Sequence, residues 1–152
     1  MKNKINILIV VVIAFMSTGC EIFLDVNYRI AIQNETNDTI RFYGSYNYPD
    51  TAISQNTPML LYPVIPHTRD YINSRGKKWE KVLVAPHDTM SIFILQQEVV
   101  NTYTWDEIRS KYLILKRYDL SITDLRNLNF VVTYPPTKAM KDIKQYPRYG
   151  SE

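Results

Sequence analysis

Residues 26–33 alternate apolar side chains with polar or small ones, which is the period-two pattern of a half-buried β-strand. The next residues, 34–38, are all polar, and most are types that hydrogen-bond their own backbone in turns. Residues 39–44 are predicted to form a second strand. The pair is therefore expected to be a hairpin joined by a short loop.

The central part of the chain is interrupted by prolines. Residues 45–68 contain four of them, Pro49, Pro58, Pro63 and Pro66. Because proline lacks a backbone donor, this part is predicted to be irregular, with short edge strands near residues 51–53 and 60–62. Further strands are expected at residues 70–72 and, where alternation returns, at residues 79–84.

The most hydrophobic strand after the N-terminal region is predicted at residues 89–95. Apolar side chains occupy both of its faces. A strand of this kind is typical of the middle of a sheet that is covered on both sides.

Two short helices are marked by capping boxes, in which the cap residue and the residue three positions later satisfy each other's backbone donors. Thr104 and Glu107 have this spacing and open a helix predicted at residues 105–110. Ser121 and Asp124 stand in the same relation and precede a helix at residues 125–128.

Strands are also predicted at residues 112–118 and 130–134, while residues 137–152 hold few apolar residues and are expected to form a mobile tail. The total is six to eight strands with two short helical turns and no βαβ alternation. This predicts a mainly β fold, an antiparallel β-sandwich, in one domain over residues 26–136.

Residues 1–19 have the three parts of a secretory signal. Lys2 and Lys4 form a basic head, residues 5–15 are almost all apolar, and residues 17–19 are small. The apolar run is shorter than the roughly 20 residues that a permanent transmembrane helix needs. We therefore expect residues 1–19 to be a signal peptide.

The signal ends at Gly19 and Cys20, and Cys20 is the only cysteine of the chain. Here the segment resembles a bacterial lipoprotein signal, in which this cysteine is lipidated, with palmitate among the acyl chains, and becomes the new N-terminus. Ser17 stands where the common motif has leucine, and such relaxed motifs resemble those of Bacteroidetes. The resemblance implies an acylated anchor and linker at residues 20–25. The alternative is a plain secretory signal followed by a free or buried cysteine.

The same resemblance implies an outer-membrane location. Residues 21–25 lack the run of acidic residues that resembles a surface-export signal of Bacteroidetes, so the periplasmic and cell-surface faces both remain open. A second resemblance runs from Trp105 through residues 117–120 to residues 134–136, and is to a recurrent pattern in small Bacteroidetes lipoproteins. It implies a shared fold and no activity.

The mature chain is close to neutral. The full sequence has 18 basic and 15 acidic residues, and the signal contains two of the basic ones, which leaves a balance of +1. A near-neutral chain with scattered charges argues against nucleic acid as a partner. With one cysteine there is no intrachain disulfide, so stability must come from a hydrophobic core, which the 45% hydrophobic content can supply.

No catalytic motif is present. His67 and His87 are the only histidines, and a metal site needs three or four suitably spaced ligands, so we expect loop histidines, no metal and no cofactor. Nucleophile-elbow, zinc-protease and phosphate-loop motifs are also missing. The chain is not predicted to be an enzyme. A hydrolase whose carboxylates converge from distant segments is the alternative.

Three segments, residues 38–40, 50–52 and 88–90, share the order aspartate, threonine, apolar residue. This resembles the O-glycosylation motif of exported Bacteroidetes proteins and implies modification at Thr39, Thr51 and Thr89. The same triplet also arises where an aspartate ends a turn and a β-branched threonine begins a strand. Both interpretations are kept.

Three tyrosines, Tyr43, Tyr46 and Tyr48, lie close together where a strand leads into a loop. Tyrosine rings suit stacking on sugars or packing in a protein interface. Alternatively, these rings cover the edge of the core.

Taken together, these features predict a membrane-anchored envelope lipoprotein that acts as a non-catalytic binding or assembly module. Acylated Cys20 would hold it in the lipid bilayer, and its partner would be another envelope protein. A glycan-binding surface lipoprotein that uses the three tyrosines is the alternative.

Overall fold

The computed structural model describes residues 28–151, apart from residues 57, 59–60 and 75. The predicted signal peptide and Cys20 lie outside the described residues. In the described part, the chain forms eight strands in two sheets, with short helices between them. The mainly β fold is therefore confirmed.

The larger sheet has five antiparallel strands in the order β3-β2-β5-β6-β8. Their bounds are Tyr62–Val64 (β3), Ile40–Ser45 (β2), Thr89–Gln96 (β5), Lys116–Ser121 (β6) and Lys144–Tyr146 (β8). Strand β5 is central, as its hydrophobicity predicted. Its alternate side chains enter two different cores, so it is covered on both faces.

The smaller sheet has the order β4-β1-β7, with bounds Arg69–Asn73 (β4), Arg29–Asn34 (β1) and Val131–Tyr134 (β7). Strand β1 is antiparallel to β4 but parallel to β7, so one pair departs from the expected antiparallel pattern. Strand β3 contains Pro63 and lies at the edge of its sheet, as its missing donor requires.

The predicted hairpin of the first two strands is wrong, because β1 and β2 belong to different sheets. Buried Asn34 explains the connection. Its side-chain amide donates to the carbonyls of Asp38 (2.8 Å) and Val64 (2.9 Å). These bonds fix the turn against the end of β3, so the chain crosses from one sheet to the other.

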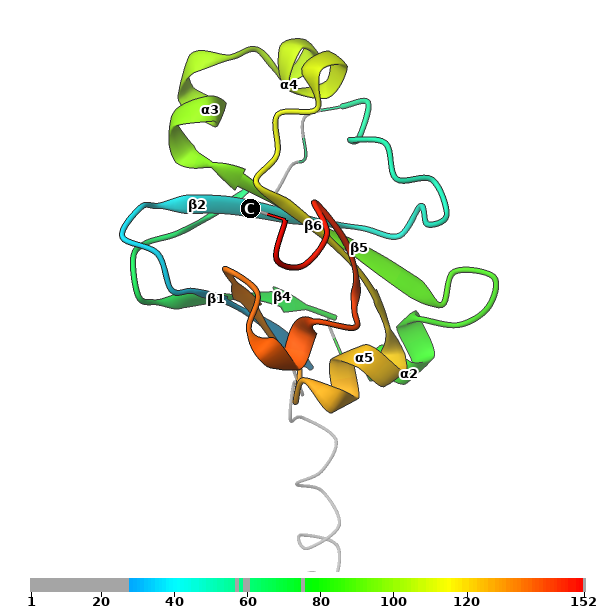
Figure 1. Cartoon of the computed structure of the whole chain (residues 1–152). Coiled ribbons are helices and arrows are strands. Elements are labelled where there is room, and N and C mark those ends of the chain that lie inside the picture. Colours follow the sequence, from blue (N-terminus) through cyan, green and yellow to red (C-terminus); the bar gives the residue numbers. More distant parts are fainter. Residues whose placement is uncertain (1–27, 57, 59–60, 75, 152) are drawn as a thin grey trace, which may run out of the picture.

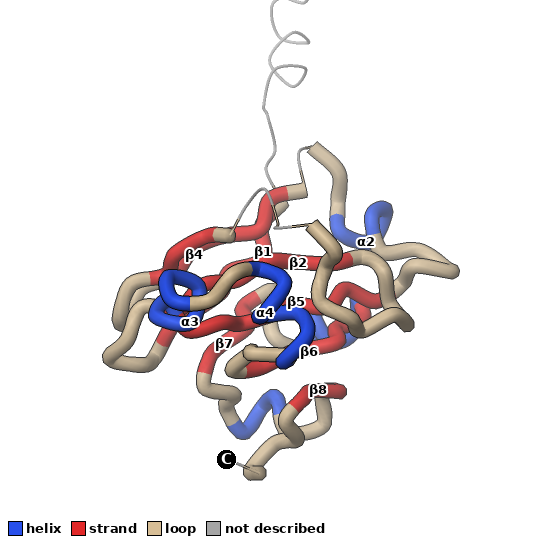
Figure 2. The backbone as a smooth tube through the Cα atoms, turned by 90° about the horizontal axis from the view of Figure 1, so that it is seen from above, coloured by secondary structure: helices blue, strands red, loops and turns tan. Residues whose placement is uncertain are grey.

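Three layers result (Figure 1). Helices α3 (Gln97–Thr102) and α4 (Trp105–Lys111) cover one face of the larger sheet, and Figure 2 shows them in front of β2 and β5. The smaller sheet covers the other face, together with α2 (Trp79–Val82) and α5 (Ile122–Asn127). The larger core lies between the two sheets, and the smaller core lies beneath α4.

Both capping boxes are confirmed, but α5 begins at Ile122, directly after its cap Ser121, and not at residue 125 as predicted. The Thr104 and Ser121 side chains accept bonds from the backbone of Glu107 and Asp124, and those two carboxylates bond back to the cap residues. Helix α3 was not predicted, and it begins directly after β5 at Gln97. It carries no side-chain cap, which removes the signal that identified the other two.

Three strand predictions differ from the structure. Residues 79–82 are helical, because Trp79, Val82 and Leu83 have the three- and four-residue spacing of one helix face, whereas in a strand Val82 would face away from the other two. Strand β6 begins at Lys116 rather than at residue 112. Tyr112 is the left-handed C-cap of α4, and the apolar residues 113–114 that follow it pack on the smaller core instead of joining a ladder. The expected edge piece at residues 51–53 is also irregular.

The expected mobile tail at residues 137–152 is wrong as well. It contains a 3-10 helix, η1 (Lys138–Met140), and strand β8, which pairs with β6. Met140 and Ile143 belong to the larger core. Two buried side chains are enough to attach a segment whose composition is otherwise polar, so the folded domain extends past residue 136.

Candidate functional site

The main candidate site is a pocket of about 560 Å³ at one end of the space between the two sheets. This volume lies within the range of small-molecule sites. The pocket is lined by residues of β2, β3, β4 and β5 and of the loops beside them: Phe42, Tyr43, Gly44, Ser45, Tyr46, Asn47, Ser54, Pro58, Tyr62, Ile72, Asn73 and Met90. None of these side chains carries a formal charge, so the pocket suits an uncharged group.

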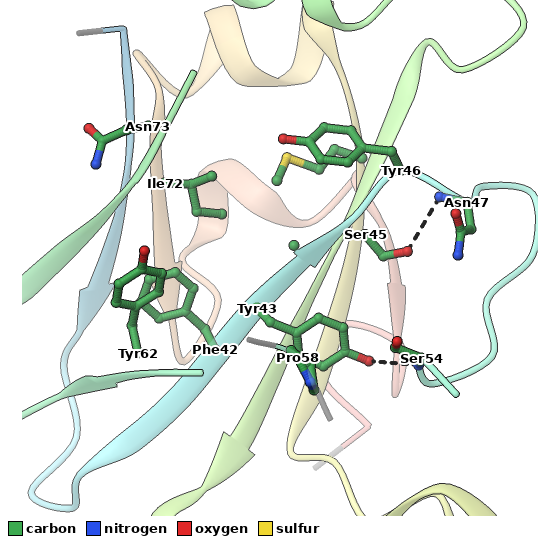
Figure 3. Close-up of a pocket in the computed structure, with 12 residues that line it drawn as sticks. Phe42, Tyr43, Ser45, Tyr46, Asn47, Ser54, Pro58, Tyr62, Ile72 and Asn73 are labelled. Atoms are coloured by element: carbon green, nitrogen blue, oxygen red, sulfur yellow. Dashed lines mark hydrogen bonds between the residues drawn. The ribbon is translucent and has the colours of Figure 1, made fainter. Parts of the chain in front are cut away.

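The pocket has an apolar wall and a polar, aromatic rim. Buried Phe42 and Met90 form part of the wall and belong to the larger core. In Figure 3, Tyr46 lies on one side of the pocket and Tyr62 on the other, with Ile72 between them. The Tyr62 ring is stacked on Phe42 at 5.5 Å between centroids, so that side of the pocket is fixed by packing.

The three tyrosines predicted as ligand-binding residues do not share one surface. Tyr46 is 41% exposed at the pocket rim. Tyr43 touches the pocket but is buried, and its ring stacks on Phe93 at 4.8 Å on the helix-covered side of the sheet. Tyr48 does not line the pocket, and its hydroxyl accepts a bond from Lys144 (2.9 Å).

Burial affects the acidity of two of these phenols. It raises the pKa of Tyr43 and the pKa of Tyr46 above the ordinary tyrosine value of 10.0. The hydrogen bond from Lys144 to Tyr48 raises the pKa of that ammonium group. At neutral pH the pocket rim is therefore uncharged, and the positive charge beside Tyr48 lies outside it.

Gly44 explains how the pocket wall is built. A Cβ at this position would lie 2.2 Å from Cε of Met90 and 3.4 Å from Cδ1 of Ile72. A glycine inside a strand often marks a close approach of this kind. Besides the tyrosine cluster that predicted Tyr46, Gly44 is a local signal in the sequence for the pocket. The other wall residues come from strands distant in sequence and carry no shared pattern.

A second cluster of polar and aromatic side chains lies on the helix-covered face of the larger sheet. Arg117 makes two bonds to the carboxylate of Asp119 (3.0 and 3.2 Å) and a third to the hydroxyl of Tyr112 (2.6 Å). Ser91 donates to the same carboxylate (2.7 Å), and Tyr112 donates to the carbonyl of Thr51 (3.1 Å). We call these four side chains, Ser91, Tyr112, Arg117 and Asp119, the closed cluster, because each is bound to another part of the domain.

The three threonines predicted as glycosylation sites lie in different settings. Thr39 and Thr89 are partly exposed, one directly before β2 and the other at the start of β5, where the turn-then-strand interpretation holds. Thr51 is partly exposed in a loop, where Asp50 accepts a bond from the backbone of Ala52 (2.9 Å). All three side chains retain some exposure.

The side chains that metal binding or hydrolysis would need are not brought together in the described part of the chain. There, no group of three or more metal-binding side chains lies close enough to hold an ion, and His67 and His87 are exposed in loops. A hydrolase would need two carboxylates in one cleft. The pocket between the sheets has none, and a smaller pocket beside α4 has only Asp106.

No helix in the described residues has the length and apolar character to cross a bilayer. No family model matches the chain, and comparisons with curated proteins and with solved structures find no match. Proposals about function therefore rest on the sequence pattern and on the geometry of the site.

Proposed function

We propose that the protein is a lipid-anchored envelope protein that acts as a non-catalytic binding module, with the pocket between its sheets as the recognition site. The observation that carries this proposal is the uncharged pocket, closed on one side by the core and open at Tyr46. An apolar wall with a few polar groups on the rim is the usual composition of a binding site for an uncharged ligand.

The lipoprotein signal that ends at Cys20 supports the anchor. Two or three acyl chains, at roughly 0.8 kcal/mol per buried methylene, hold a protein firmly to a bilayer. Cys20→Ala should release the protein from membrane pellets without unfolding it, because Cys20 precedes the domain. Retention of this variant in the pellets would contradict the anchor.

Photo-crosslinking in intact cells tests the pocket directly. A benzophenone amino acid would replace Tyr46, and in a matched variant it would replace Tyr48, which is close in sequence but not part of the pocket. Adducts would be identified by mass spectrometry. We expect one dominant adduct at position 46 and little at position 48. Equal adducts at both positions, or none at either, would contradict the pocket as recognition site.

A glycan is a second candidate ligand, favoured by the two tyrosines and the side-chain amide of Asn73 on the rim. Purified residues 21–152 would be run on a polysaccharide retention panel, beside Tyr46→Ala and Tyr48→Ala. Retention that is lost only in Tyr46→Ala would place a glycan in the pocket. Retention that is unchanged in Tyr46→Ala would exclude the pocket as the glycan site.

A further inference from the structure

The pocket lies at the end of the domain where the chain enters from Cys20. Asn73 on the rim pairs with Arg29 at the start of β1, and the next residue, Ser74, donates its amide to the carbonyl of Tyr28 (3.0 Å). Tyr28 is eight positions after Cys20. A fully extended chain spans at most about 3.6 Å per residue, so an acylated Cys20 keeps this end within about 29 Å of the bilayer.

The same end of the domain is positively charged. Lys77 is joined to Ser74 through its backbone amide (3.2 Å), and Lys78 follows it. Both side chains are exposed. Nearby Glu80 is paired with Arg126 (3.1 Å), and although Lys78 also helps to lower the pKa of Glu80, this one carboxylate faces three cationic side chains. The linker contains Glu21 and Asp25, so an attraction to anionic lipid must come from the folded end.

The pocket complements the part of a lipid that lies beneath its headgroup. Its wall contains Ile72 and the flexible side chain of Met90, and methionine adapts to apolar ligands of irregular shape. Tyr46 and Tyr62 on the rim have the amphipathic character of side chains that concentrate at membrane interfaces. Cationic side chains close to an anionic bilayer strengthen the attachment further.

We infer that this end of the domain docks on an anionic bilayer, with Lys77 and Lys78 at the headgroups and an acyl chain of an anionic phospholipid in the pocket. The inference rests on the anchor and the pocket of the proposed function and names the ligand. The anchor brings the pocket to the membrane surface, the lysines select anionic lipid, and the uncharged wall receives the chain.

The first test is vesicle co-sedimentation of purified residues 21–152, which lack the acyl anchor. Vesicles would be made of phosphatidylcholine alone, or with about a third phosphatidylglycerol. We expect binding only to the anionic vesicles. Binding should weaken in about 1 M salt, where charges are screened within about 3 Å. Equal binding to both vesicle types, or none to either, would overturn the inference.

A charge-reversed double variant and a matched control test which lysines contact the anionic vesicles. Lys77→Glu/Lys78→Glu should lower the vesicle partition coefficient at least about tenfold. The control, Lys138→Glu/Lys141→Glu, changes the net charge by the same amount, and both positions are exposed. These two lysines lie beside β8, toward the opposite edge of the molecule from α2 (Figure 2). The control should change the coefficient little. Equal losses in both variants would overturn the assignment of this end.

The second test asks whether an acyl chain enters the pocket. Residues 21–152 contain no cysteine, so Tyr46→Cys and Tyr48→Cys can each carry one fluorescent label. Phospholipids with a nitroxide on the acyl chain should quench the label at position 46 several-fold more than the label at position 48. Equal quenching would overturn chain insertion. If, without vesicles, the fluorescence emission of the label at position 46 shifts to the blue as the protein concentration rises, the pocket is occupied by a second copy of the protein and not by lipid.

These outcomes separate the inference from the proposed function. If vesicle binding fails but the crosslink at position 46 persists in cells, the pocket binds another ligand and only the lipid inference is overturned. If the crosslink also fails, both are overturned.

Discussion

The closed cluster and the pocket are built from similar residues but differ in how those residues are bound. In the closed cluster, Arg117, Asp119 and Ser91 satisfy one another, and Tyr112 connects them to the loop at Thr51. At the pocket, the Tyr46 ring remains 41% exposed beside an apolar wall. Polar side chains bonded within the fold hold it together, whereas an exposed ring on an apolar wall is available to a ligand.

The difference follows from the neighbours across the sheet. Strand β6 lies between β5 and β8, so Asp119 has Ser91 opposite it on one side and Lys144 on the other. In the described residues, β3 pairs with β2 only from Ile40 to Phe42. The pocket lies beyond this point, at Gly44 and Ser45. The short edge strand thus leaves space for the pocket.

The largest expected effect comes from opening the closed cluster. Asp119→Ala leaves the partly buried guanidinium of Arg117 without its carboxylate, and removing one partner of a buried ion pair costs up to about 3–5 kcal/mol. Urea unfolding would measure this loss. Asp106→Ala is the control, because the Asp106 side chain is 90% exposed in its pair with Arg109, and it should cost at most about 0.5 kcal/mol. Similar losses in both variants would mean that the cluster does not stabilise the fold.

A smaller effect is expected from filling the pocket wall. Gly44→Ala places a methyl group against Cε of Met90, and overpacking of this kind costs about 1–3 kcal/mol. The flexible end of Met90 must move, which changes the shape of the pocket. In a Met90→Ala background the same substitution should cost much less, so a double-mutant cycle measured by urea unfolding would show strong coupling. Additive losses would contradict this contact.

Local signals in the sequence predicted several elements correctly. Alternation located β1, the strands predicted at residues 39–44 and 70–72 correspond to β2 and β4, hydrophobicity on both faces identified β5 as central, and two capping boxes located α4 and α5. Each of these signals depends on residues that lie close together in the sequence. At residues 79–82 alternation predicted a strand, although Trp79, Val82 and Leu83 have the spacing of one helix face, and the structure has a helix.

Pairing and the candidate site depend on contacts between distant residues, which local patterns do not encode. Nothing near Asn34 indicates that its amide reaches Val64, so the crossing between sheets was missed. Tyr46 was predicted from its cluster of tyrosines, but its partners Ile72 and Met90 come from other strands. Adjacent residues of a strand point to opposite faces of the sheet. The Tyr43 ring points to the helix-covered face of the larger sheet and packs in the smaller core, so it does not join Tyr46 at the pocket rim.

Alkaline pH should reveal the burial of the Tyr43 hydroxyl. Burial raises the pKa of Tyr43 above 10.0, so the unfolded chain loses this proton first. The stability that Tyr43 contributes is complete below pH 10 and decreases as the pH rises above it. At about pH 11 the loss should approach roughly 1.4 kcal/mol. Urea midpoints of the wild type and Tyr43→Phe should therefore diverge between about pH 8 and pH 11. A constant difference would contradict the burial of this hydroxyl.

The smallest effect on stability is expected at Tyr46. Its ring has no hydrogen-bond or ring-stacking partner in the described part of the chain and is partly exposed, so Tyr46→Ala should change the free energy of unfolding by at most about 0.5 kcal/mol. Capture of the pocket ligand should nevertheless be lost. Tyr48→Ala, which removes a ring bound to Lys144 outside the pocket, should leave ligand capture unchanged. A large loss of stability in Tyr46→Ala would instead make this tyrosine part of the core, and the contrast with the closed cluster would disappear.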